Sequence, residues 1–376
     1  MRCLILFLLL SISQSLIAQP QYYNWAMGNC VIKVSENGVE EVIETDKYLG
    51  IGSFSVSNPN GILSVMGDAS AIMDYEGNVL ENINGSIITR SASIVSPFDE
   101  WHVIVFMSVF RSKGSELVMY VVDTRTASII YRKVLFDKEF RFLVAVPGAD
   151  DSAAWLIIKE DRSSVFCVYK ILEGYQCIQN SVYDCGFAFE SFHLSEIITN
   201  NSFDKIYFKR EDNNIFSVDF DDRRGVLSNT RKYNGTECTS FALSASDKYL
   251  ITFKDGCINK YDVALLEADG EANIPMASLD MPRDELGSMK IGIADMISGP
   301  DGKIYGVGGS ADNDGTVMVY LHCIDDWGSD GIDFIPNIVC VKASDNWVLF
   351  PRYPKIKQVP KPCPDMKPPV IRWNVR

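Results

Sequence analysis

SASDKYLITF (Ser244–Phe253) and SGPDGKIYGV (Ser298–Val307) are two copies of the element that decides the fold. In each copy a short polar turn is followed directly by an apolar strand. The residue types of this segment favour a tight turn, because Pro fixes φ, Asp bonds the local backbone and Gly accepts a positive φ. The element therefore indicates a hairpin whose second strand returns toward a core.

The same element recurs along the chain. Further copies are SNPNGILSV from Ser57, SPFDEWHVIVF from Ser96, PGADDSAAWLII from Pro147 and NNSFDKIYF from Asn200. Equivalent Asp or Asn positions are 39 to 54 residues apart, measured at Asn60, Asp99, Asp151, Asp204, Asp247 and Asp301. This period is typical of one four-stranded blade of a β-propeller.

A second repeated element supports the same architecture. Apolar strands end in Asp-bearing turns in MYVVDTRTASII (Asp123), FSVDFDDRRGVLSN (Asp219) and INKYDVALLEA (Asp262), and each is interpreted as strand, turn, strand. Helical periodicity is nearly absent. We therefore predict an all-β propeller. Six turn repeats and the segment Tyr22–Val34 predict seven blades of four-stranded antiparallel sheet, with six blades as the alternative.

The N-terminus has the order of a secretory signal. Arg2 precedes an apolar run from Leu4 to Leu10, and a polar patch then leads to the small residue Ala18. The apolar run is much shorter than the roughly 20 residues that cross a bilayer. We expect residues 1–18 to be a removable signal peptide, residues 19–350 to form the propeller, and the protein to be secreted, to the periplasm or the exterior. No later stretch predicts a transmembrane segment.

The last 26 residues, 351–376, differ in kind from the propeller. They contain seven prolines and seven Lys or Arg residues against one acidic residue. Such a segment is expected to run as extended, polyproline-like chain. It is interpreted either as a strap across an acidic body or as a flexible terminus, and the apolar stretch Val370–Val375 could dock.

The formal net charge of the chain is −14. A field of this sign repels phosphate backbones, so nucleic acid is excluded as an expected partner.

The cysteines predict disulfides. Removal of Cys3 with the signal peptide leaves nine, none in a Cys-x-x-Cys pair, and an oxidising compartment favours bridges. The first candidate pair is Cys167 with Cys177, because the intervening residues predict a hairpin that places the two opposite one another. The second is Cys238 with Cys257. The alternative is that these are buried free thiols acting as small apolar residues.

The three histidines do not predict a metal site. His102, His193 and His322 fall in different repeats and lack ligand spacing, so each is expected to have an ordinary hydrogen-bond partner. No nucleophile elbow, P-loop or dinucleotide fingerprint occurs either. The sequence therefore predicts no catalytic and no cofactor-binding residues.

Acidic loops near the C-terminal end carry the remaining chemical signal. Asp312 and Asp314 lie two residues apart, and Asp325 and Asp326 follow. Hard oxygen ligands at this spacing suit calcium, but the closing Glu of a twelve-residue calcium loop is missing. Solvated turn aspartates are the alternative. The sequence thus predicts no cofactor, with calcium at these four residues as a hypothesis.

Large aromatic residues are grouped near both ends of the propeller. They are Tyr22, Tyr23, Trp25, Trp327 and Trp347. They could line a binding face, but packing between blades is the favoured interpretation.

The repeats resemble those of a group of secreted bacterial propellers, the WD-like N-terminal regions of type IX secretion and gliding-associated surface proteins. The resemblance is carried by FSVDFDDRRGVLSN (Phe216–Asn229), ALSASDKYLITF (Ala242–Phe253), MISGPDGKIYGVGG (Met296–Gly309) and DFIPNIV (Asp333–Val339), and covers roughly Tyr22–Val341. Members commonly continue into immunoglobulin-like repeats and a sorting domain, whereas a Pro-rich segment follows here. The resemblance implies secretion and a binding or scaffold role, and brings no catalytic residues.

Two functional hypotheses follow from these observations. The first is a non-enzymatic secreted propeller that binds a protein or a component of the cell envelope. The alternative is a propeller hydrolase or lactonase-like enzyme that uses carboxylates, with or without calcium, at the mouth of the channel. Converging Asp, Glu, His or Asn side chains in the channel would favour the enzyme.

Overall fold

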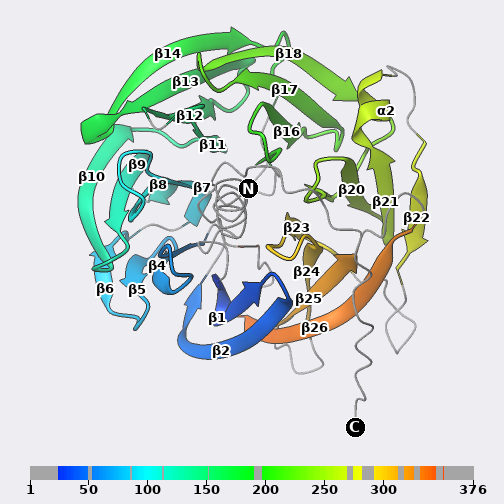
Figure 1. Ribbon diagram of the computed structural model, residues 1–376, viewed down its shortest axis with the longest axis horizontal. Coiled ribbons are helices and arrows are strands. Elements are labelled where there is room, and N and C mark those ends of the chain that lie inside the picture. The colour runs from blue at the N-terminus through cyan, green and yellow to red at the C-terminus, as the bar shows by residue number, and fades with distance from the viewer. Residues whose placement is uncertain are drawn as a thin grey trace, which may run out of the picture.

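The fold is a β-propeller of six four-stranded blades arranged in a ring (Figure 1). The computed structural model describes residues 24–49, 53–84, 87–111, 114–150, 152–189, 197–268, 274–281, 292–311, 317–325, 331–343 and 350. The predicted signal peptide (1–18) and the Pro-rich segment (351–376) lie outside these residues and stay predictions.

The strands of the first three blades follow one another along the chain. Blade 1 comprises β3 (Phe54–Ser57), β4 (Leu63–Gly67), β5 (Ala71–Asp74) and β6 (Val79–Asn82). Blade 2 comprises β7 (Ile87–Val95), β8 (His102–Arg111), β9 (Gly114–Asp123) and β10 (Ser128–Phe136). Blade 3 comprises β11 (Phe142–Pro147), β12 (Ala154–Lys159), β13 (Val165–Leu172) and β14 (Gln176–Asp184), with the 3-10 turn η2 (Glu173–Tyr175) between its last two strands.

The remaining blades repeat this order. Blade 4 comprises β15 (Ile197–Thr199), β16 (Lys205–Lys209), β17 (Ile215–Asp221) and β18 (Val226–Tyr233). Blade 5 comprises β19 (Ser240–Leu243), β20 (Tyr249–Lys254), β21 (Cys257–Asp262) and β22 (Ala277–Asp280), with the helix α2 (Val263–Ala268) before its last strand. Blade 6 comprises β23 (Asp295–Ser298), β24 (Ile304–Ala311), β25 (Val317–Asp325) and β26 (Asp333–Ala343).

The prediction of seven four-stranded blades is wrong, because the N-terminal segment supplies only two strands. These are β1 (Asn24–Ser35) and β2 (Gly38–Leu49), which pair with each other. Strand β1 contacts β3 of blade 1 and β26 of blade 6. The β1–β2 sheet therefore fills the place in the ring between the first and the last blade (Figure 1).

The predicted turns join the first two strands of the blades. In blade 5 the N–H of Asp247 donates to the Ser244 carbonyl at 2.9 Å, and Asp247 has a φ of 58°. In blade 6 the N–H of Gly302 donates to the Gly299 carbonyl at 3.1 Å, and Gly302 has a φ of 83°. In these two blades a polar or glycine turn residue with a positive φ thus precedes the return strand, as predicted.

The segment after Asp262 corrects the interpretation of INKYDVALLEA as strand, turn, strand. The carboxylate of Asp262 accepts the backbone N–H of Ala264 at 2.8 Å and that of Leu265 at 3.2 Å. A carboxylate in this position caps a helix N-terminus. The short helix α2 forms there, and the next strand begins only at β22.

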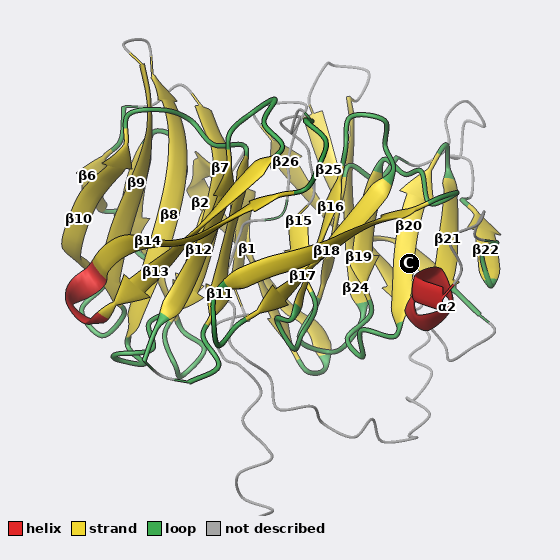
Figure 2. Cartoon of the chain, turned by 90° about the horizontal axis from the view of Figure 1, so that it is seen from above, coloured by secondary structure: helices red, strands yellow, loops and turns green. Residues whose placement is uncertain are grey.

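The core lies between the faces of neighbouring blades, which stand side by side with turns at both ends (Figure 2). Between blades 3 and 4 the Phe142 ring packs against Phe166 and Phe208, with centroids 4.9 and 5.5 Å away. All three side chains are buried. Burying each such ring contributes about 1.5–3 kcal/mol, so contacts between blades stabilise the ring.

Trp25 belongs to this core, which confirms the packing interpretation for the one predicted aromatic among the described residues. It is fully buried, and its ring makes edge contacts with Tyr305 at 5.1 Å and Phe350 at 5.3 Å. The N–H of Phe350 donates to Asp295 Oδ2 at 3.1 Å. Phe350 therefore ties the end of the described chain to both β1 and β23, where the ring closes.

Candidate functional site

The candidate site is the central channel, which the first strand of each blade surrounds (Figure 1). It contains a cavity of about 150 Å³. The walls come from β7, β11, β15, β19 and β23 and from the turns after the last three of these strands. Five repeats far apart in the sequence thus build one concave site, the usual setting for a small-molecule ligand.

The walls of the cavity are largely apolar. Ala92, Leu143, Ala145, Ala242 and Met296 line it, and all five are buried. Small side chains on the inner strands leave the central space open, and their apolar character favours a ligand with an apolar part.

Polar residues gather where β15 and β19 end. The N–H of Asn201 donates to Asp247 Oδ2 at 2.7 Å, and Asn201 Nδ2 donates to the Ala245 carbonyl at 2.7 Å. These bonds join the first turn of blade 4 to the first turn of blade 5. We call this end of the channel the Asn201–Asp247 mouth.

Arg90 is the one cation among the described residues that line the cavity. Its side chain is buried, and one guanidinium nitrogen donates to the Ile197 carbonyl of β15 at 3.4 Å. The Arg90 side chain therefore reaches from blade 2 to blade 4. It supplies positive charge at the wall formed by the starts of these strands.

The described lining does not bring an acid and a base together. Asp247 is the one carboxylate among these lining residues, and they include no histidine. General acid–base chemistry needs a positioned pair or a partnered base. Among the described lining residues the cavity holds no such pair.

The calcium candidates are only partly described. Asp312, Asp314 and Asp326 lie outside the described residues. Asp325 ends β25, and its Oδ2 lies 3.6 Å from Lys303 Nζ. Among the described residues no group of three or more His, Cys, Asp or Glu side chains could hold a metal. The calcium site stays a prediction.

The two candidate disulfides are not present in the structure. The predicted hairpin of β13 and β14 forms, but its register pairs Cys167 with Val182 and Cys177 with Ile171. The prediction that Cys167 and Cys177 lie opposite each other is therefore wrong. The turn is centred nearer Cys177 than expected, and a register shift between Val168 and Tyr169 displaces the strands further.

Cys238 and Cys257 do not form a disulfide either. Cys238 lies just before β19 and Cys257 begins β21, and β20 pairs with both of these strands. A bridge requires Cα atoms within about 7 Å, which strands on opposite sides of a third strand do not provide.

Two of the three histidines lie in the described chain, and both have ordinary partners, as predicted. The Nδ1 atom of His102 lies 2.8 Å from the Tyr175 hydroxyl of blade 3, and that of His322 accepts the Asn337 N–H at 3.1 Å. His193 lies outside the described residues.

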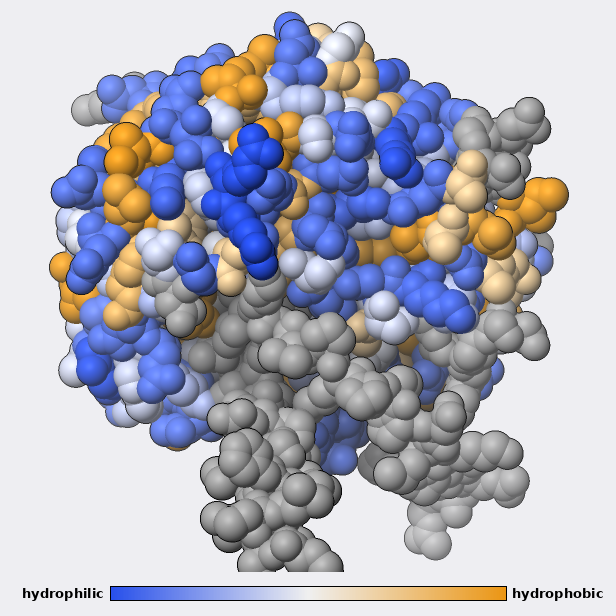
Figure 3. All heavy atoms as spheres, turned by 45° about the horizontal axis from the view of Figure 1, so that its top comes forward, coloured by the Kyte–Doolittle hydropathy of each residue, from blue (hydrophilic) through white to orange (hydrophobic). Residues whose placement is uncertain are grey.

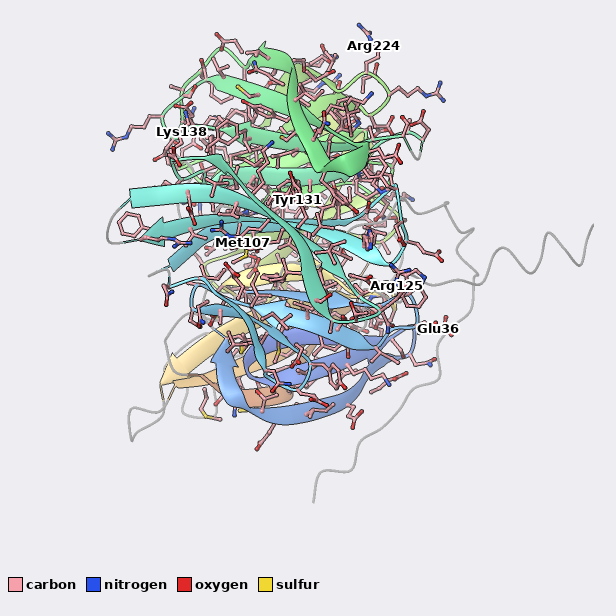
Figure 4. All side chains as sticks on the ribbon, turned by 90° about the vertical axis from the view of Figure 1, so that its left-hand side faces the viewer. Glu36, Met107, Arg125, Tyr131, Lys138 and Arg224 are labelled. Atoms are coloured by element: carbon pink, nitrogen blue, oxygen red, sulfur yellow. The ribbon has the colours of Figure 1, made fainter. Side chains whose placement is uncertain are left out.

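His102 belongs to a charged cluster that sequence reasoning did not identify. Its Nε2 atom lies 3.6 Å from Asp99 and 3.7 Å from Asp123, and Arg125 binds both carboxylates. Figure 4 views the disc edge-on and shows Arg125 at one face and Lys138 at the opposite face. The four side chains lie within blade 2, and the contact between His102 and Tyr175 links them to blade 3.

The described residues of the face drawn in Figure 3 do not concentrate one residue type. Figure 3 shows mostly polar side chains over the visible face, with apolar side chains in small scattered groups. Among the described residues no helix is long and apolar enough to cross a membrane.

Neither a protein-family model nor a curated protein matches this sequence. Solved structures do match. A putative 6-phosphogluconolactonase from Bacteroides uniformis is 11% identical, with a TM-score of 0.54, over 87% of this chain and 99% of that one. Kuenenia stuttgartiensis hydrazine synthase is 13% identical, with a TM-score of 0.50, over 83% and 97%.

A third match is the periplasmic gluconolactonase of Pseudomonas aeruginosa, which is 12% identical with a TM-score of 0.45 over 67% and 77% of the two chains. At these identities the likeness concerns the fold alone. The propeller architecture is thus common to proteins of different chemistry, and the function of this chain must be argued from its own channel.

Proposed function

We propose that this protein is an exported, non-enzymatic binding module whose ligand enters the central channel. The observation that carries the proposal is the cavity that five inner strands frame, with apolar walls, one buried cation and one carboxylate. A pocket of this kind fixes the orientation of a ligand through a few polar groups and gains affinity from its apolar surface. The ligand is a small molecule, or a small group borne by a protein or other component of the cell envelope.

Export is part of the proposal and rests on the sequence of residues 1–18. Cleavage after Ala18 would give a secreted chain that begins at Gln19. The mass of the protein recovered outside the cytoplasm tests this directly, and a chain that retains Met1 would contradict export by this route.

The binding proposal is tested by obstructing the Asn201–Asp247 mouth. Ala245 lines the cavity there and is exposed, so Ala245→Trp should block entry without disturbing the core. Asn60→Trp is the matched control, because Asn60 is an exposed residue of the equivalent turn in blade 1. Thermal unfolding midpoints are measured for the three proteins with a panel of sugars, amino acids and carboxylic acids.

A ligand that binds the native state must raise the unfolding midpoint. We expect at least one compound to do so for the natural chain and for Asn60→Trp, but not for Ala245→Trp. Equal shifts in all three proteins, or no shift with any compound, would contradict the channel as the binding site. Hydrolysis of a sugar lactone that Ala245→Trp abolishes would instead establish the enzyme alternative, and its loss on chelation would implicate calcium.

A further inference from the structure

The sheet of β1 and β2 has two strands where every blade of the ring has four. Figure 1 shows β2 at the periphery, outside β1. Among the described strands only β1 pairs with β2, so none occupies the other edge of this 12-residue strand. An edge of this length offers backbone N–H and C=O groups to an added strand.

The middle of β2 is exposed on both faces. Residues 40–44 are exposed without interruption, including Val42 at 40% and Ile43 at 46%. The outer strand β10 of blade 2 contrasts with it, since only three of its nine residues are exposed. The middle of β2 is therefore more open to solvent than that outer strand.

The exposed part of β2 is acidic. Glu40, Glu41 and Glu44 lie in the exposed stretch, and of these Glu40 has an ion pair with Lys33, at 3.7 Å. Charge of this sign favours an occupant that is extended and basic.

A segment with these properties follows Phe350 in the same chain. Residues 370–376, VIRWNVR, contain no proline, carry two arginines and are rich in residues that favour strands. The 19 residues between Phe350 and Val370 contain all seven prolines of the tail. Extended at about 3.1 Å per residue, this spacer would reach about 60 Å.

The anchor of the tail lies at the correct end of the sheet. Phe350 packs against Trp25 at the start of β1, and the register pairs Gly28 of β1 with Leu49 at the end of β2. A chain that leaves Phe350 thus starts near the last residues of β2. From there it can run antiparallel to β2, toward Gly38.

We propose that residues 370–376 of this chain form a third strand on the free edge of β2. Their backbone would pair with β2, and their two arginines would lie beside the acidic stretch that holds Glu40, Glu41 and Glu44. Prolines cannot donate to a ladder, so the spacer itself would not pair. The interaction would attach the basic tail to the acidic sheet at the point where the ring closes.

Hydrogen exchange of the full-length chain tests the proposal. Arg372→Pro removes a ladder donor from the middle of the added strand. Met366→Pro is the matched control, because it adds a proline to the Pro-rich spacer. We expect amides of β2 to exchange at least about tenfold faster in Arg372→Pro than in the natural chain, with no change in Met366→Pro and none in β10.

Three results would overturn the proposal. Equal exchange of the β2 amides in the natural chain and in Arg372→Pro would mean that no strand is added to the edge of β2. The glutamates would then serve only to discourage pairing at that edge. Faster exchange in both variants would show that the spacer, not residues 370–376, covers β2. A dimer that Arg372→Pro dissociates would place the tail on a second copy, against the intramolecular pairing proposed.

Discussion

His322 shows how one buried side chain couples the fold to pH. It lies in β25 with 1% of its surface exposed, and its Nδ1 atom accepts the N–H of Asn337 in β26. Asn337 has a φ of 53°, and the register of the two strands shifts between Leu321 and Cys323. The neutral ring therefore satisfies a backbone group at an irregular point of the ladder. Burial lowers the pKa of His322 to about 4.

We predict that stability falls between pH 6.5 and 4 because of this residue. The folded pKa lies below the unfolded value, so the unfolded chain binds more protons in this range and acid favours unfolding. The loss approaches about 3 kcal/mol near pH 4. Urea unfolding of the natural chain and of His322→Gln from pH 7 to 4 measures it. If the free energy of unfolding changes equally with pH in the two proteins, His322 does not titrate in this range.

Single residues were predictable from the sequence where the reason is local. Asp247 and Gly302 lie in tight turns, as their neighbours in the sequence indicate. The role of His322 was not predictable, because it depends on a backbone N–H 15 residues away. Arg90 was missed for the same reason, since it reaches the carbonyl of a residue 107 positions later.

At the scale of elements, neighbouring blades are joined by contacts between their turns and strands. Trp155 of β12 donates from Nε1 to the Asp222 carbonyl at 2.7 Å, in the turn between β17 and β18 of blade 4. Gly225 in this turn has a φ of 63°, and a Cβ atom there would overlap the Trp155 ring. The turn is therefore fitted to the indole of the preceding blade.

Gly225→Ala is expected to lower the free energy of unfolding by about 2–4 kcal/mol, because it adds overlap in a packed site to backbone strain. Gly174→Ala is the control, since Gly174 has a φ of 73° but no heavy atom within 4 Å of the added Cβ. It should cost only about 1 kcal/mol. Chemical denaturation compares the two variants, and equal losses would mean that Trp155 contributes nothing to the effect.

The sequence predicted which elements exist better than it predicted their register. The hairpin of β13 and β14 was predicted, but the pairing of Cys167 and Cys177 depends on one turn and one irregularity that periodicity does not reveal.

One repeated feature of the sequence was overlooked although it carries information about the fold. The second strands of four successive blades end in a cation, at Arg111, Lys159, Lys209 and Lys254. Lys159 shows why, since its Nζ donates to three carbonyls, among them that of Phe189 at 2.8 Å.

At the scale of the whole molecule, the ring closes through packing. Trp25, Tyr305 and Phe350 meet where the β1–β2 sheet adjoins blade 6, and the Phe350 side chain has 1% of its surface exposed. One residue near the C-terminal end thus contacts both the N-terminal strand and the last blade. Removal of the Phe350 side chain should therefore destabilise the ring closure more than it destabilises the parts of the ring that lie far from it.

Phe350→Ala is predicted to cost about 3–5 kcal/mol, the usual loss for a buried ring. Amides of β1 and β23 should exchange faster than those of β11. Phe110→Ala serves as control, because this side chain is 44% exposed and should cost less than about 1 kcal/mol. Uniformly faster exchange around the ring would contradict a local role in closure.

The period of the turns predicted the architecture because each blade is specified by local chemistry. Six turn repeats correspond to six four-stranded blades. The count of seven was wrong because the described segment before β3 supplies only the two strands β1 and β2. The channel was not predictable at all, since residues of five repeats must assemble before its cavity exists.

Hydrogen exchange of the full-length chain, with and without the compound that the thermal panel identifies, tests whether the channel binds the ligand. We expect slower exchange at the ends of β15, β19 and β23 and in the turns of the Asn201–Asp247 mouth, with β10 and β14 unchanged. Protection confined to the outer strands, with the channel strands unaffected, would contradict it.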